Sequence, residues 1–375
     1  MEKKNKIAII GGGASALVAS IFASKNNDVT IFCENSLGKK LLVTGNGRCN
    51  LTNMGGFDVA YNTDVKSYLS RFNNLDTIEF FNSLGLEVYH DDEGRVYPLS
   101  NSAQSVVDVL NTKIQKLGVK VQKEDVFDVK IGKKILINNN FEFDKVIVAS
   151  GSEASALDLF NVEYKKFSPS LVALVTKQNT KRLSGIRLSD VKVTLKIDGK
   201  EYVEYGEVLF KDNGLSGICI FNLSSYLARR GEYNGKIVID MLPKQTINET
   251  TKMLTNRTRL GYKTFGEFMQ GLFNNQVNKF VLWQSGLEES DSLTQEKIEI
   301  LAKTIKSLSF DIVDNYGNNQ VKSGGISLDD LTQNLEHKNL HGVYFVGELC
   351  DVDGLCGGYN LQWAFASGKI AGESI

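Results

Sequence analysis

A glycine turn between a short buried strand and a helix is the feature that most limits how this chain can fold. Residues 7–10 are apolar, and Gly11, Gly12 and Gly13 follow them directly. Gly11 would allow the tight turn, and Gly13 would let the backbone approach a pyrophosphate because it carries no side chain. Ala16 stands where a third glycine is usual and is small enough for close helix–strand packing. This arrangement is typical of a dinucleotide-binding βαβ unit.

The residues after the turn strengthen this interpretation. Apolar residues recur at helical spacing over 14–25, and the positive end of that helix would face the phosphates. A second apolar strand over 29–33 ends at Glu34, about 20 positions after the glycines, where such units bind a ribose hydroxyl. An isolated glycine motif would equally suit an ordinary turn. Strand, helix, second strand and acidic residue together favour the nucleotide site.

Length and composition limit the class of protein. A chain of 375 residues allows two or three domains, and its net charge of -1 gives no bulk attraction for nucleic acid or a membrane. No apolar stretch is long enough to span a bilayer, and the basic start at 1–4 does not resemble a secretory signal. Five cysteines without a CxxC pair predict neither a disulfide framework nor a metal site, so a cytoplasmic location is expected.

The residue pattern changes along the chain and predicts nested domains. Strands and helices alternate up to about residue 150, strands dominate from about residue 170, and helices dominate from about residue 248. Short strands then lead back, 319–322 into the β region and 342–347 into the first region. The predicted boundaries are 1–168 and 326–375 for the nucleotide-binding domain, 169–245 and 308–325 for the β domain, and 246–307 for a helical insert.

Within the first domain, helices are expected over 64–84 and 102–117. Short strands over 119–121, 126–129, 134–137 and 141–143 would form a meander, and a further buried strand, 146–149, leads to Gly151. A glycine crossing after a β meander is the second landmark expected of an FAD domain.

The C-terminal part of the chain decides between FAD and NAD as the predicted cofactor. A strand over 343–346 ends at Gly347 and Glu348, where the carboxylate could accept hydrogen bonds from ribityl hydroxyls. Gly357 and Gly358 then open a helix, whose N-terminal amides would stabilise negative charge on the pyrimidine edge of reduced flavin. A structural glycine turn would explain this segment alone. Combined with the first motif, it favours FAD.

Residues 38–53 form a third distinctive segment. Gly45 and Gly47 suggest close backbone approach, and Lys40 and Arg48 are candidates to neutralise the pyrophosphate. A polar surface loop is the alternative for this segment taken alone.

Four segments, 38–53, 91–98, 206–217 and 347–365, carry a family resemblance. Together they resemble the bacterial NAD(P)/FAD-dependent oxidoreductase family that includes aminoacetone oxidase and a bile-acid double-bond reductase. The resemblance extends over nearly the whole chain. It implies an α/β fold with a discontinuous Rossmann-like FAD-binding domain of the glutathione-reductase type, an inserted β-barrel-like domain and a helical insert.

The resemblance also implies roles for single residues. Glu34 would hold the adenosine ribose, the Val126 backbone would meet the adenine, and Asn360 and Leu361 would present amides to the flavin. Relatives usually carry a longer glycine-rich loop and helix after Gly151, so part of the cleft wall is expected to be missing here. The residues predicted to bind the cofactor are Gly11, Gly13, Ala14, Ser15, Ala16, Glu34, Asn35, Lys40, Thr44, Gly45, Gly47, Arg48, Cys49, Asn50, Val126, Gly151, Gly347, Glu348, Asp353, Gly357, Gly358, Asn360 and Leu361.

No catalytic residue is predicted. Each of the three histidines suits a surface or structural role better than catalysis. Cys49 and Cys356 are far apart in sequence, unlike the close cysteine pair of flavin disulfide reductases, and small buried residues explain both. Tyr359 could be an aromatic wall or a proton donor, and the wall is favoured.

Three functions are compatible with the sequence. The favoured one is a reductase that passes hydride from NAD(P)H through flavin to a small organic substrate. No second GxGxxG unit is present, so NAD(P)H would bind transiently. The alternatives are a peroxide-producing amine oxidase and a non-catalytic flavin-binding interaction protein. We expect a small-molecule substrate, no nucleic acid, no membrane and no metal, and the oligomeric state stays open.

Overall fold

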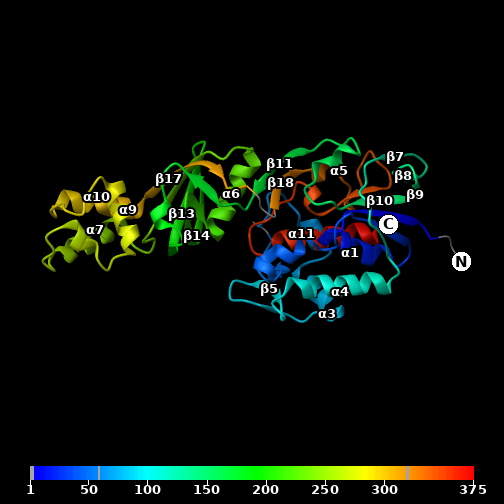
Figure 1. Ribbon diagram of the computed structural model, residues 1–375, viewed down its shortest axis with the longest axis horizontal. Coiled ribbons are helices and arrows are strands. Elements are labelled where there is room, and N and C mark those ends of the chain that lie inside the picture. The colour runs from blue at the N-terminus through cyan, green and yellow to red at the C-terminus, as the bar shows by residue number, and fades with distance from the viewer. Residues whose placement is uncertain (1–3, 58–59, 318–320) are drawn as a thin grey trace. The chain divides into compact units, whose positions relative to one another are not determined.

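The computed structural model describes residues 4–57, 60–317 and 321–375 of the chain (Figure 1). The chain divides into two compact units: unit 1 contains Met1–Pro169 and Gln320–Ile375, and unit 2 contains Ser170–Asn319. Two sequence predictions fall partly outside the described residues, namely residues 319–320 of the strand expected at 319–322 and residues 1–3 of the basic start.

Unit 1 has an α/β composition. Its helices are α1 (Ala14–Ala23), α2 (Lys66–Leu69), α3 (Asn74–Ser83), α4 (Ala103–Lys116), α5 (Ala154–Asp158) and α11 (Tyr359–Glu373), with short 3-10 turns at Leu41–Gly47, Leu328–Asp330 and Gly347–Leu349. Its strands are β1 (Lys6–Ile10), β2 (Asp28–Phe32), β3 (Thr52–Asn53), β4 (Val88–His90), β5 (Arg95–Pro98), β6 (Lys120–Gln122), β7 (Val129–Ile131), β8 (Ile135–Ile137), β9 (Phe141–Phe143), β10 (Lys145–Val148), β11 (Lys165–Ser170), β18 (Val321–Gly325) and β19 (Val343–Phe345).

A five-stranded parallel sheet in the order β19-β10-β1-β2-β6 forms the centre of unit 1. In β1, Ile9 lies opposite Ile147 of β10 on one side and Ile31 of β2 on the other. All three side chains are fully buried. Strands of a parallel sheet are covered on both faces, which explains the continuous apolar runs that made them recognisable in the sequence.

Helices α1 and α11, the first and last of the chain, lie side by side in unit 1 (Figure 1). Their contact depends on glycine, because a Cβ atom at Gly368 would lie 2.5 Å from the carbonyl oxygen of Ser15. A Cβ atom at Gly372 would lie 2.6 Å from the carbonyl oxygen of Ala19. The two helices therefore touch backbone to backbone, which fixes their N-terminal ends relative to each other.

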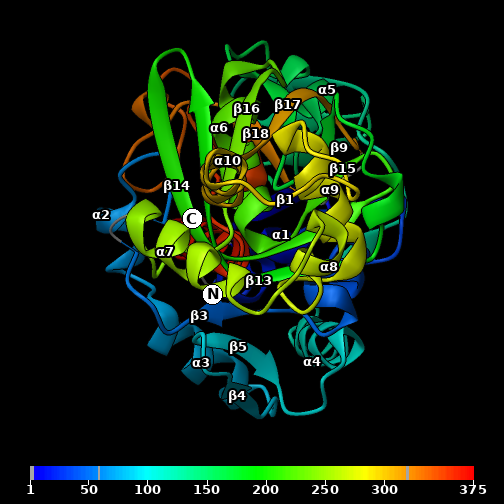
Figure 2. The same ribbon diagram turned by 90° about the vertical axis from the view of Figure 1, so that its left-hand side faces the viewer.

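Two small antiparallel sheets complete this part of unit 1. Strands β7, β8 and β9 form a meander, as predicted for 134–137 and 141–143. The strand expected at 119–121 instead corresponds to β6, which pairs with β2 in the parallel sheet. Strands β3, β5 and β4 form the second sheet, and Figure 2 shows it beside α3 and α4.

Unit 2 combines a β-barrel with helices. The barrel is closed in the order β12-β15-β14-β13-β16-β17, and Phe310 of β17 stacks on Phe280 of α9 with 5.5 Å between the ring centroids. Barrel and helices thus share one hydrophobic core. The elements are β12 (Leu174–Thr176), β13 (Arg187–Ile197), β14 (Lys200–Lys211), β15 (Gly214–Ser216), α6 (Ile218–Arg230), β16 (Gly235–Asp240), α7 (Ile247–Thr258), α8 (Phe265–Met269), α9 (Asn275–Ser285), α10 (Gln295–Lys306) and β17 (Leu308–Asn315), with a 3-10 turn at Lys181–Leu183.

Two further sequence predictions differ from the structure. The single helix expected at 64–84 is two helices, because Asn73 accepts hydrogen bonds from the amides of Leu75 and Asp76 and so caps a new helix, α3. The stretch 321–325, assigned to the β domain within 308–325, instead forms β18 and pairs with β11 in unit 1. Positive φ angles at its two glycines let β18 lie directly on neighbouring backbone.

None of the helices in the described part of the chain combines the length and the apolar character needed to cross a bilayer.

Candidate cofactor site

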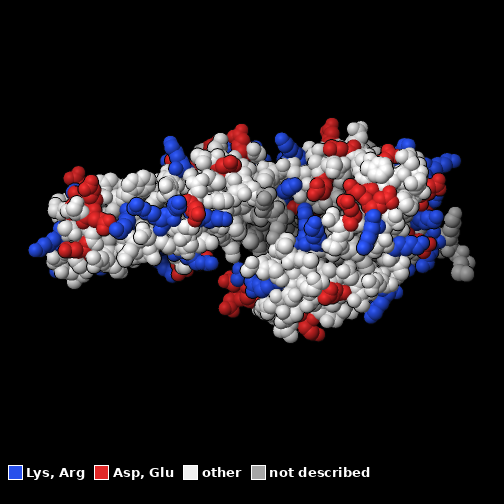
Figure 3. Space-filling model, in the orientation of Figure 1, with Lys and Arg blue, Asp and Glu red and all other residues white. Residues whose placement is uncertain are grey.

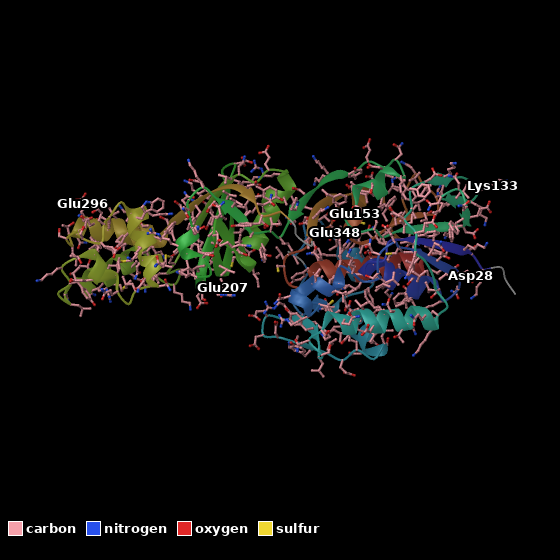
Figure 4. All side chains as sticks on the ribbon, viewed as in Figure 1. Asp28, Lys133, Glu153, Glu207, Glu296 and Glu348 are labelled. Carbon is pink, nitrogen blue, oxygen red and sulfur yellow. The ribbon has the colours of Figure 1, made fainter. Side chains whose placement is uncertain are left out.

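A cavity opens at the carboxyl ends of β1, β10 and β19, where ligands bind in open parallel sheets. The turns after these strands reach it through Gly13, Gly151 and Glu348. Figure 4 labels Glu348 among the side chains of unit 1. The cavity is lined by Gly13, Ala14, Ser15, Lys40, Leu41, Thr44, Ala149, Gly151, Val321, Glu348, Val352, Asn360, Leu361, Trp363 and Ala364.

The two outer glycines of the first motif have different physical tasks. Gly11 has a φ of +109°, and a Cβ atom there would lie 2.4 Å from the carbonyl oxygen of Ala149. Gly13 has a φ of -82° and no atom within 4 Å of its Cβ position. The fold thus requires glycine at position 11, whereas glycine at position 13 leaves space free at the cavity wall.

Two helix N-termini meet at this cavity. Helix α1 begins after Gly13 and α11 begins after Gly358, and neither has a hydrogen bond from a capping side chain. The first amides of a helix have no partner within the helix, so they are available to a ligand. Ala14 and Ser15 of α1 and Asn360 and Leu361 of α11 line the cavity. Aligned amides and the helix dipoles favour negative charge there.

The start of α11 is held rigidly by its surroundings. The Asn360 side chain accepts a hydrogen bond from the amide of Gly354 and donates one to its carbonyl oxygen, both at 2.9 Å. The Tyr61 hydroxyl donates to the carbonyl oxygen of Tyr359 at 2.7 Å. Gly358 is at φ +103°, and a Cβ atom there would lie 2.4 Å from the carbonyl oxygen of Thr52. The Asn360 side chain is therefore occupied, which leaves its backbone as the part available to a cofactor.

An ion pair lies at the cavity wall. Lys40 Nζ is 3.2 Å from Glu348 Oε2, and Glu348 Oε1 accepts a hydrogen bond from the amide of Lys322 at 2.8 Å. Gly151 is adjacent, since its Cβ position lies 3.0 Å from Lys40 Nζ. A carboxylate oxygen has more than one lone pair, so Glu348 can accept further hydrogen bonds from hydroxyl groups.

Two buried polar atoms beside the cavity have no hydrogen-bond partner among the described residues, namely Asn50 Oδ1 and Ser150 Oγ. Ser150 stands between the cavity residues Ala149 and Gly151, and Asn50 Oδ1 lies 2.8 Å from the Cβ position of Gly358. Buried polar atoms are normally paired. Together with the open space at Gly13 and the two uncapped helices, they fit an elongated ligand with phosphate and polar ring groups, such as FAD.

Part of the predicted set of residues lines this cavity. Those that line the cavity are Gly13, Ala14, Ser15, Lys40, Thr44, Gly151, Glu348, Asn360 and Leu361. Gly11, Ala16, Gly347, Gly357 and Gly358 belong to the turns and helix starts around it, and Gly45, Gly47, Arg48, Cys49 and Asn50 follow the cavity residue Thr44. Sequence reasoning missed Leu41, Ala149, Val321, Val352, Trp363 and Ala364.

Other predicted residues are not among those that line this cavity. Glu34 and Asn35 are exposed just after β2, and Val126 is buried before β7. Asp353 is buried, where it accepts a hydrogen bond from the hydroxyl of Ser323 at 3.1 Å. This carboxylate therefore has a protein partner, which suits a structural role in the turn before α11.

Cys49 and Cys356 are free thiols. Burial raises the pKa of the Cys49 thiol to about 12 and also raises the pKa of Cys356. Both thiols are therefore protonated near neutral pH, and a protonated thiol is a poor nucleophile. Cys49 is buried, as predicted, whereas Cys356 is partly exposed.

The parallel sheet, the glycine turns and the paired helix N-termini define a Rossmann-like, FAD-dependent oxidoreductase. The family described as HI0933-like protein Rossmann domain matches residues 5–374, and the chain belongs to this family. The predicted fold class and the FAD cofactor are thereby confirmed.

Several known proteins are similar to the chain over almost its full length. The 3-dehydro-bile acid delta(4,6)-reductase of Clostridium scindens is 33% identical, with 99% of this chain and 98% of the relative covered. The ribosomal RNA dihydrouridine synthase of Haemophilus influenzae is 25% identical, with 100% and 99% covered. The solved 3-ketosteroid delta1-dehydrogenase of Sterolibacterium denitrificans aligns over 99% of both chains at 9% identity and a TM-score of 0.49.

The alignment also places gaps in this chain. It spans 406 positions with the C. scindens protein, 31 more than the 375 residues of this chain, so the relative has at least 31 residues opposite gaps. After β10 the chain has only the five-residue helix α5 before β11 begins at Lys165. This is where the sequence predicts a shortened segment.

Proposed function

We propose that this protein reduces a carbon–carbon double bond conjugated to a carbonyl group in a small organic molecule, with NAD(P)H as the electron donor. The observation that carries the proposal is the 33% identity, over 99% of the chain, to a 3-dehydro-bile acid delta(4,6)-reductase. A 3-dehydro steroid carries a carbonyl at C3, and its Δ4 and Δ6 double bonds are conjugated to it.

The second group of relatives supports the same bond type. Dihydrouridine is uridine whose C5=C6 bond, conjugated to the C4 carbonyl, has been reduced, and the relatives named for its synthesis cover this chain completely. Hydride transfer from reduced flavin suits such bonds, because the carbonyl accepts the negative charge that develops.

Charge favours a small molecule over ribosomal RNA as the substrate of this chain. RNA-binding surfaces concentrate Lys and Arg, whereas this chain has 43 basic and 44 acidic residues. Figure 3 shows both signs interspersed on the face that it draws.

Different cavity residues would bind different groups of the cofactor. FAD, when bound, supplies the hydride chemistry. The amides at the start of α1 and Lys40 would bind the pyrophosphate, Glu348 would accept hydrogen bonds from ribityl hydroxyls, and the amides at the start of α11 would stabilise negative charge on the flavin. Leu41 and Trp363, both about 1% exposed, exclude water from the cofactor.

Anaerobic flavin absorbance tests the proposal. NADH or NADPH should bleach the protein-bound flavin, and a 3-oxo-4,6-diene bile acid should restore its colour in stoichiometric amount. The matched saturated 3-oxo bile acid should not restore it. Failure of both nucleotides to bleach the flavin would refute the proposal, and peroxide release with a small amine would instead identify an amine oxidase.

A further inference from the structure

Arg48 is a cationic residue close to the cofactor cavity in sequence, but it does not line the cavity. The sequence pairs Arg48 with Lys40 as a candidate for the pyrophosphate, but only Lys40 lines the cavity. The guanidinium of Arg48 instead lies over the ring of Tyr97, with 4.2 Å from Cζ to the ring centroid. Its Nη2 atom lies 3.4 Å from the Tyr97 hydroxyl.

The platform beneath Arg48 is fixed. Tyr97 is 3% exposed, its ring packs 6.0 Å from that of Tyr89, and its edge lies 3.5 Å from the Cβ position of Gly45. A guanidinium on an aromatic face keeps N–H donors at its edges, which suits planar, two-point recognition of a carboxylate.

A second arginine beside Tyr97 provides a contrast. Arg95 donates to Asp91 and to Glu93, both at 2.7 Å, so its charge is already matched. Arg48 has no ion pair with any residue that the structure describes. It is also only partly exposed, so an anion bound there would be shielded from solvent and held more strongly than at the surface.

The backbone places Arg48 next to the cavity, although Arg48 does not line it. Positive φ angles at Gly45, Asn46 and Gly47 reverse the chain directly after Thr44, which lines the cavity. The amide of Cys49 then returns to the carbonyl oxygen of Thr44 at 3.0 Å. Arg48 therefore lies within one turn of the cofactor wall, in reach of a substrate that extends beyond the flavin.

We propose that Arg48 binds a carboxylate of the substrate, at a distance from the double bond that is reduced. The inference rests on the proposed function, and it narrows the substrate class to conjugated carbonyl compounds that carry an acid group. Such a contact is present in substrate and transition state alike, so it lowers KM and leaves kcat nearly unchanged.

The test compares Arg48→Gln and Arg48→Lys with a substrate pair, a 3-oxo-4,6-diene bile acid and its methyl ester. For the acid, Arg48→Gln should raise KM by roughly 10- to 100-fold, the loss expected for a charge-assisted hydrogen bond, and change kcat by less than about threefold. The KM of Arg48→Lys for the acid should lie between those of the wild type and Arg48→Gln, because lysine keeps the positive charge but lacks the paired N–H donors of a guanidinium. The ester should show no such change, and Arg95→Gln should keep the wild-type ratio of the KM values for acid and ester.

A second readout does not depend on turnover. Binding of the saturated 3-oxo bile acid is measured by the perturbation of flavin absorbance, and Arg48→Gln should weaken it by the same factor. Acid binding that Arg48→Gln weakens, without turnover in the wild type, would refute the reductase but support the carboxylate site. Equal losses for acid and ester, loss of FAD from Arg48→Gln, or no acid binding by the wild type would overturn the proposal.

Discussion

Substituting alanine at Gly11 and at Gly13 separates what the fold needs from what the cofactor needs. Gly11→Ala introduces a Cβ atom 2.4 Å from a carbonyl oxygen at a φ of +109°. Backbone strain of about 1–3 kcal/mol and overpacking of about 1–3 kcal/mol predict a loss of roughly 2–6 kcal/mol in unfolding free energy. That is a large fraction of the stability of a typical domain.

Gly13→Ala should behave in the opposite way. Its φ of -82° is open to alanine, and no atom lies within 4 Å of the new methyl group. The free energy of unfolding of the FAD-free protein should therefore change by no more than about 0.5 kcal/mol. The methyl group would occupy space beside the α1 amides, and the loss of one or two hydrogen bonds to a charged phosphate, about 1.5–3 kcal/mol each, would weaken FAD at least tenfold.

The chain offers a convenient probe for this comparison. Its two tryptophans are divided between the units: Trp363 is buried at the cavity wall and Trp283 is 61% exposed in unit 2. In a Trp283→Phe background, Trp363 fluorescence reports urea unfolding of unit 1 and quenching by added FAD. A Gly13→Ala variant that binds FAD as tightly as the parent would refute the assignment of the pyrophosphate to this turn.

Three further predictions use other parts of the molecule. Lys40→Met should lower FAD affinity measurably while changing the free energy of unfolding by less than about 1 kcal/mol, because an exposed ion pair such as that of Lys40 with Glu348 adds little stability by itself. An unchanged FAD titration would contradict the role of Lys40 in binding the pyrophosphate. Gly368→Ala should destabilise unit 1 by about 1–3 kcal/mol in urea unfolding, because it forces α11 away from Ser15; an unaltered midpoint would exclude backbone contact there. Burial raises the pKa of Glu204, and this effect outweighs a hydrogen bond from an amide side chain that would lower it. Ionisation of Glu204 therefore destabilises the folded state as pH rises above 4.5. Glu204→Gln should raise the unfolding temperature at pH 7 but not at pH 3, and an equal effect at both pH values would contradict burial as the cause.

The parts of the fold that follow local rules could be predicted from the sequence. The strand, turn and helix around Gly11 depend on contiguous residues, and so does the start of α11 after Gly358. The split of the helix expected at 64–84 carried a local signal as well, because Asn73 and Asp76 stand three residues apart, the spacing of a capping box.

Other features depend on contacts between distant segments, which a single sequence does not reveal. Val321 lines the cavity only because β18 pairs with β11, and a strand-like run does not specify its partner. Leu41, Val352 and Trp363 belong to the cavity wall through packing, and apolar side chains carry no motif that separates a wall from a core. Arg48 and Lys40 are close in sequence, but the left-handed turn at Gly45 lies between them.

The cavity is assembled from segments at the two ends of the chain, and this sets the order of events during synthesis. Lys40 and Glu348, which meet at its wall, are 308 residues apart. At roughly 5–20 residues per second, a ribosome needs about 15–60 s to make that interval. During this time β10 has no β19 beside it and α1 has no α11 against it. We expect the nascent N-terminal segment to need protection from aggregation, and FAD to enter only once α11 has been made.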